Sequence, residues 1–170
     1  MNAMRLHMLA IAVSLASAAA LTALPAQAAG ATTEAAHDHG AAAPGKLSLD
    51  HGRRWATDQP LRDGMGRIRA LVEPQLDKAH ENKLTPAQYA ALAGQIETEI
   101  GGIVANCKLE PKADAMLHMV IGQIGNGTEA MAGKAPKLKP QQGLVQVAAA
   151  VNDYGRYFDH PGFKPIRVGH

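Results

Sequence analysis

The sequence predicts an all-α protein: an antiparallel up-down-up-down four-helix bundle preceded by a signal peptide and a disordered linker. Four segments between Thr57 and Phe158 repeat apolar residues at spacings of three and four, which is typical of one buried helix face. Each segment begins with a proline or a capping residue. No segment alternates apolar and polar residues over a sustained length, so we predict no strands. The connections are short, which favours antiparallel neighbours.

The chain begins with the three parts of a secretory signal. Arg5 and His7 provide a positive start, and the run from Met8 to Leu24 is apolar and uncharged. Ala26-Gln27-Ala28 then places small residues at the two positions that a signal peptidase reads. We therefore expect residues 1–28 to be removed after Ala28. The mature protein is then periplasmic, with no membrane insertion once the signal is gone.

Residues 29–50 are expected to form a flexible linker that carries histidines. Most of this stretch consists of Ala, Gly and Thr, which cannot bury enough apolar surface to offset the entropy of the chain. Leu47, Leu49 and Trp55 are expected to attach the segment around His51 to the folded body. The bundle is assigned to residues 51–162 and a C-terminal tail to residues 163–170.

The first two helices have clear start signals. Thr57 or Asp58 caps the first helix, and Pro60 lies in its first turn. Its apolar stripe is Leu61, Met65, Ile68, Val72, Leu76 and Ala79. Thr85-Pro86-Ala87-Gln88 is a capping box that opens the second helix. The stripe of this second helix is Tyr89, Leu92, Ala93, Ile96, Ile100, Ile103, Val104 and Cys107.

The third helix is predicted to start near Pro111 and the fourth near Pro140, after the longest connection. The stripe of the third is Leu117, Val120, Ile121, Ile124 and Met131. That of the fourth is Leu144, Val147, Ala148, Val151, Tyr154 and Phe158. Gly155 lies on the stripe of the fourth helix, where we expect it to let a second helix approach closely.

Composition excludes several classes of function. Without Arg5, the chain has 16 Lys and Arg against 15 Asp and Glu, so nothing favours nucleic acid as a partner. Cys107 is the only cysteine, which rules out an internal disulfide and covalent c-type haem attachment. Nucleophile elbows, phosphate loops and His-Glu-x-x-His motifs are all missing from the sequence. We therefore expect no enzyme.

Two groups of residues have the chemistry of metal ligands. His37, Asp38 and His39 lie in the linker, followed by His51, and imidazoles on a flexible chain suit copper, nickel or zinc. The bundle topology gathers a second group, of soft ligands suited to Cu(I), at one end: Met65, Cys107, Met116, His118 and Met119.

Both groups also have a simpler interpretation. The linker histidines can be part of a solubilising segment, and Met65 and Cys107 can be ordinary core residues. Helical angles direct His118 and Met119 away from the core, with Asp114 one turn before His118 and able to pair with it.

Short motifs resemble known families. Asp63-Gly64-Met65 and Asn152-Asp153-Tyr154 resemble the helix ends that present the axial ligands of the soluble periplasmic b-type cytochrome, a four-helix bundle. Gly155 stands where the axial histidine would be, so we expect no haem. TDQPLRDGMGRIRA, GGIVANCKLEPKADAMLHMVI and YGRYFDHPGF are similar to exported proteobacterial proteins described as DnrO-like. That resemblance covers nearly the whole mature chain and implies an exported helical protein, without an activity.

The first hypothesis for function is therefore an exported, non-enzymatic metal-binding protein, a copper buffer or carrier. The alternative is a periplasmic interaction or scaffold bundle that docks another exported protein and binds no specific metal. A b-type haem protein is the remote alternative.

Overall fold

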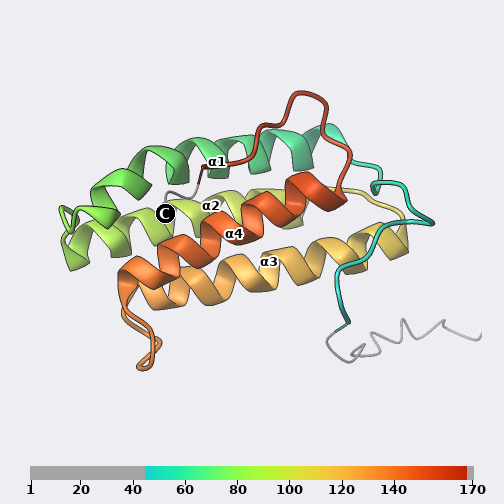
Figure 1. Ribbon diagram of the computed structural model, residues 1–170. Coiled ribbons are helices and arrows are strands. Elements are labelled where there is room, and N and C mark those ends of the chain that lie inside the picture. Colours follow the sequence, from blue (N-terminus) through green and yellow to red (C-terminus); the bar gives the residue numbers. More distant parts are fainter. Residues whose placement is uncertain (1–44, 168–170) are drawn as a thin grey trace, which may run out of the picture. The chain divides into compact units, whose positions relative to one another are not determined.

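The computed structural model describes residues 45–167, which form four antiparallel α-helices (Figure 1). The helices are α1 (Gln59–His80), α2 (Pro86–Asn106), α3 (Pro111–Met131) and α4 (Pro140–Tyr157). Each helix packs against its neighbours around the bundle, most extensively α3 against α4, and α2 also touches α4 across the bundle. Among the described residues there is no strand, only two isolated bridges. The predicted fold class is confirmed.

The helix starts agree with the sequence signals. Asp58 caps α1, and its side chain accepts a hydrogen bond from the backbone N–H of Leu61 at 3.0 Å. Thr85 and Gln88 form the predicted capping box of α2. All four helices have proline in their first turn, where its missing N–H costs no hydrogen bond.

The core follows the predicted stripes with one exception. The largest fully buried side chains include Tyr154, Phe158, Leu61, Met65, Ile68 and Leu76. Val104 was expected in the core, and this prediction was wrong, because its side chain is 59% exposed. Ile103 and Cys107, one turn apart, occupy the inward face at this level, and Val104 is turned about 100° away from Ile103.

The segment before α1 is attached to the bundle through Leu47 and Trp55. Both side chains pack against the core, while Leu49 is exposed, contrary to expectation. The indole N–H of Trp55 donates to the carbonyl of Ser48 at 2.6 Å. The backbone N–H of Trp55 donates to the carbonyl of Tyr157 at the end of α4. Residues 1–44, which contain the predicted signal peptide and most of the predicted linker, lie outside the described residues.

The chain after α4 folds back along the bundle, where it lies between α4 and α1 (Figure 1). Ile166 is buried in the core, and its backbone N–H and C=O both bond to the side-chain amide of Asn152, at 2.7 and 3.0 Å. The neighbour of Gly155 is the ring of Phe163 in this segment, not a second helix as expected. A Cβ at Gly155 would lie 2.8 Å from that ring, so glycine makes room for the returning chain.

Candidate functional site

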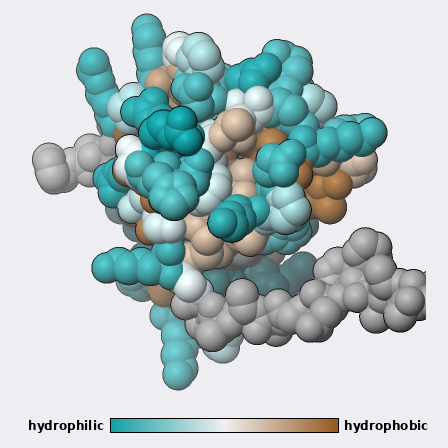
Figure 2. Space-filling view, turned by 90° about the vertical axis from the view of Figure 1, so that its right-hand side faces the viewer, coloured by the Kyte–Doolittle hydropathy of each residue, from teal (hydrophilic) through white to brown (hydrophobic). Residues whose placement is uncertain are grey.

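Sulfur-containing, titratable and charged side chains lie close together at one end of the bundle, which we call the pole. Here α1 and α3 begin and α2 and α4 end. Figure 2 views the molecule from this side and shows mainly hydrophilic side chains around a smaller pale and apolar area. The polar character of this end distinguishes it from the apolar interior between the helices.

Asp58 joins the start of α1 to the connection between α2 and α3 at the pole. One carboxylate oxygen caps α1, and the other accepts a hydrogen bond from the backbone N–H of Lys108 at 2.6 Å. Lys108 belongs to the connection between α2 and α3, so a single carboxylate fixes the start of α1 against this connection. The side chain of Cys107 is close enough to the same carboxylate for its charge to act on the thiol.

Cys107 is half-buried, and its surroundings suppress its ionisation. Burial raises the pKa of the thiol to about 11, with further contributions from Asp58 and Asp114. The thiol is therefore protonated at neutral pH, whereas the thiolate is the form that binds metals and reacts as a nucleophile. This environment favours the packing role for Cys107 over metal ligation.

The methionines at the pole have two kinds of environment. Met65 is completely buried in the core. Met116 and Met119 are half-buried on α3, under the segment that leads into α1. The hydroxyl of Ser48 donates to the sulfur of Met116 at 3.9 Å, and Met119 lines a shallow hollow together with Leu47. Two thioethers thus lie near the surface beside the incoming chain.

His118 lies on the other flank of α3, because it is about 200° around the helix from Met116. Its Nδ1 is 3.3 Å from a carboxylate oxygen of Asp114, which confirms the pairing expected from the sequence. The structure therefore does not bring His118 together with Met116 and Met119.

The predicted histidine ligands are spread along the N-terminal part of the chain. His51 is 86% exposed and lies 3.8 Å from the carboxylate of Asp50. His37 and His39 lie outside the described residues. Within residues 45–167, no three or more His, Cys, Asp or Glu side chains are arranged to hold a metal ion.

A buried tyrosine and a histidine form the most distinctive polar contact of the pole. The hydroxyl of Tyr154 lies 2.9 Å from Nδ1 of His160, and the two rings meet edge to face. Burial raises the pKa of Tyr154 well above its usual value. Burial, and then the nearby charge of Arg62, lower the pKa of His160, while Asp63 acts in the opposite direction. Both groups are therefore neutral at neutral pH.

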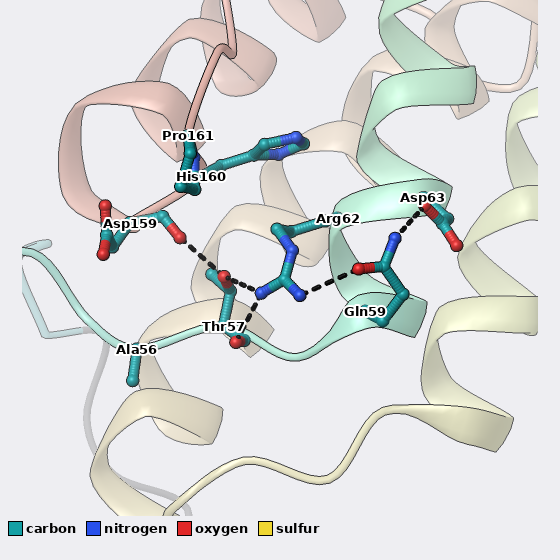
Figure 3. A pocket seen from close by; sticks show the side chains of 8 residues that line it. All are labelled: Ala56, Thr57, Gln59, Arg62, Asp63, Asp159, His160 and Pro161. Atoms are coloured by element: carbon teal, nitrogen blue, oxygen red, sulfur yellow. Dashed lines mark hydrogen bonds between the residues drawn. The ribbon is translucent and has the colours of Figure 1, made fainter.

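His160 also lines a pocket of about 550 Å³ between the start of α1 and the chain after α4 (Figure 3). This pole pocket is lined by Ala56, Thr57, Gln59, Arg62, Asp63, Asp159, His160 and Pro161. The sequence pattern did not assign Arg62 or Thr57 to a functional site. The only signal was the helix register, which places Arg62 one residue beyond the buried Leu61, beside the N-terminal cap.

The residues behind the cytochrome resemblance have other partners here. The side chain of Asn152 holds Ile166, and Asp153 lies 3.6 Å from Arg156. Gly155 lies under Phe163.

No family model matches the chain, and neither the curated proteins nor the solved structures include a match. No helix between residues 45 and 167 has the length and apolar character needed to cross a membrane.

Proposed function

We propose that this protein is an exported, non-enzymatic copper-binding protein that acts as a buffer or carrier in the periplasm. In this proposal His37, His39 and His51 provide imidazoles for Cu(II). Met116 and Met119 provide thioethers for Cu(I), since soft sulfur ligands select the reduced ion. The two sets are proposed as separate sites.

The observation that supports the proposal is the placement of two half-buried thioethers at the edge of the core. Met65 and Met131 are almost fully buried, as is typical of methionines that fill gaps between helices. Met116 and Met119 instead lie three residues apart on one flank of α3, where their side chains are neighbours. The side chain of Met116 packs against the edge of the core, and its sulfur also accepts a hydrogen bond from the exposed Ser48.

The periplasmic location is part of the same proposal. The signal-like pattern of residues 1–28 and the resemblance to DnrO-like exported proteins both support it. An extracytoplasmic compartment is oxidising, which favours Cu(II) and therefore the histidine set.

The Cu(II) test is the combined variant His37→Ala, His39→Ala and His51→Ala. We expect the tightest Cu(II) binding to be lost while far-UV circular dichroism stays unchanged, because no described contact of the core involves His51. Since neutral imidazole is the ligand, affinity should fall steeply below about pH 6.5. His118→Ala is the matched control, because it removes an exposed imidazole outside this set. Equal losses in the two variants would contradict a dedicated site.

The Cu(I) test uses Met116→Leu and Met119→Leu under reducing conditions. Leucine keeps the apolar volume and removes the sulfur, so Cu(I) affinity should fall with little change in stability. Met131→Leu, a change to a buried methionine on the same helix, should leave Cu(I) affinity unaltered. If all three variants bind Cu(I) as the unchanged protein does, the thioether site is wrong. If the protein binds neither Cu(II) nor Cu(I) specifically, the alternative of an interaction or scaffold bundle that docks another exported protein replaces the copper proposal.

A further inference from the structure

The pole pocket contains a guanidinium, that of Arg62, with no described carboxylate within ion-pair distance. The guanidinium of Arg62 donates to the carbonyl of Thr57 at 2.7 Å, to its hydroxyl at 3.0 Å, and to the side-chain oxygen of Gln59 at 2.9 Å (Figure 3). All three acceptors are neutral. Among residues 45–167, Arg53, Arg67, Arg69 and Arg156 each have a carboxylate within 4.0 Å, whereas Arg62, like Arg54 and Arg167, has none.

Arg62 is held in place and still has free hydrogen-bonding capacity. A guanidinium has five N–H groups, and the three bonds to Thr57 and Gln59 leave two without an acceptor among the described residues. The side chain is half-buried, which weakens the solvation of its charge. A fixed, half-buried and unpaired guanidinium at the wall of an open pocket is suited to binding an anion.

His160 adds a second donor on the same pocket. Its Nδ1 is occupied by the hydroxyl of Tyr154. When this hydroxyl donates to Nδ1, a neutral imidazole carries its hydrogen on Nε2. No described residue accepts from Nε2, so this N–H remains available to a ligand in the pocket that Arg62 also lines.

Two carboxylates restrict the charge of the ligand. Asp63 and Asp159 line the pole pocket, and Figure 3 shows the carboxylate of Asp159 turned away from Arg62. Asp63 accepts a hydrogen bond from the side chain of Gln59 at 2.6 Å. Their negative charge disfavours a dianion more strongly than a monoanion. A single carboxylate can still face Arg62, because the carboxylate of Asp159 is turned away and that of Asp63 is bonded to Gln59. Ala56 and Pro161 provide apolar wall for a short hydrocarbon group.

We propose that the pole pocket binds a small organic monocarboxylate, with Arg62 on the carboxylate and His160 as a second donor. A volume of about 550 Å³ is within the usual range for small-molecule pockets. The site is independent of the proposed copper ligands, none of which lines this pocket.

The test is a titration of the purified, isotope-labelled protein followed by NMR chemical shifts, with sodium propionate as the probe. Propionamide is the neutral isostere, and inorganic phosphate is the more highly charged anion. We expect propionate to shift the signals of Thr57, Arg62 and His160 in a saturable way, and propionamide to shift them by much less. Absence of saturation by propionate at millimolar concentration would overturn the proposal, as would equal or tighter binding of phosphate or propionamide.

The variants Arg62→Gln and Arg67→Gln complete the experiment. Arg67 lies on the same helix but is paired with Glu99 at 2.7 Å, so it is the matched control. Arg62→Gln should weaken propionate binding at least about tenfold, because a charged hydrogen bond is lost, and Arg67→Gln should leave it unchanged. His160→Asn provides a second test that does not depend on how Arg62→Gln folds, and it should also weaken binding. Wild-type affinity in either pocket variant, with helical circular dichroism retained, would contradict the assignment.

Discussion

The contact between α3 and α4 depends on two glycines, and replacing one of them is a sharp test of the packing. A Cβ at Gly143 would lie 2.5 Å from the carbonyl oxygen of Gly127 and 2.8 Å from the backbone nitrogen of Met131. Both are backbone atoms of the facing helix, so no rotamer change can relieve the overlap. Gly143→Ala therefore forces the two helices apart at their closest point.

Two opposing effects determine how much Gly143→Ala changes the free energy of unfolding. Alanine in a helix interior is favoured over glycine by about 1 kcal/mol. Overpacking a tight interface costs about 1–3 kcal/mol, and the upper end applies because the clashing atoms are backbone. We therefore expect Gly143→Ala to lower the free energy of unfolding by roughly 2 kcal/mol. Gly122→Ala on α3 has nothing within 4 Å of the added Cβ, so it should raise that free energy by up to about 1 kcal/mol.

Urea unfolding followed by far-UV circular dichroism measures both variants. With a slope of about 2 kcal/mol per molar urea, Gly143→Ala should shift the midpoint down by about 1 M. Gly122→Ala should shift it slightly upward. Equal midpoints for the two variants would show that α3 and α4 do not approach as closely as described, and would refute the reasoning.

Three further predictions concern the pole and the chain start. Asp58→Ala removes the cap of α1 and the bond to Lys108, and should lower the free energy of unfolding by about 1–2 kcal/mol in thermal or urea unfolding; an unchanged stability would contradict the capping role. Because the pKa of Cys107 is raised to about 11, the folded protein should react with a thiol-alkylating reagent at pH 8 at least about tenfold more slowly than the unfolded chain. The rate of the folded protein should rise as the pH approaches the pKa of the thiol. Equal rates for the folded and unfolded chains would show an ordinary thiol. N-terminal sequencing of the protein from its native cell should begin at or near Ala29, and a retained Met1 would overturn export.

The sequence was sufficient to predict the four helices, because their signals are local. Proline in the first turn and the Thr85–Gln88 capping box act within a few residues, and the stripes repeat within each helix. The antiparallel order followed from the short connections. The burial predicted for Val104 was wrong, because the spacing of apolar residues does not determine how wide the buried face of a helix is. In α2 the exposed side begins at Val104, one residue after the buried Ile103.

Features that depend on distant segments could not be predicted in this way. Gly127 and Gly143 look like ordinary helix-weakening residues until α3 and α4 are placed side by side. Phe163 lies just after Pro161-Gly162, a pattern that predicts an end of structure, yet the chain returns to α4. The pole pocket joins the start of α1 to residues after α4, about a hundred positions apart, and single-chain periodicity contains no information on that pairing.

Native mass spectrometry of the protein titrated with Cu(II) distinguishes a dedicated copper site from loose binding to surface histidines. We expect one species with a single copper ion per chain to fill before any second ion binds. This species should be lost at pH 5, because protons compete with the metal for imidazole nitrogen. A statistical mixture of chains with several loosely bound ions, formed equally at both pH values, would contradict this expectation.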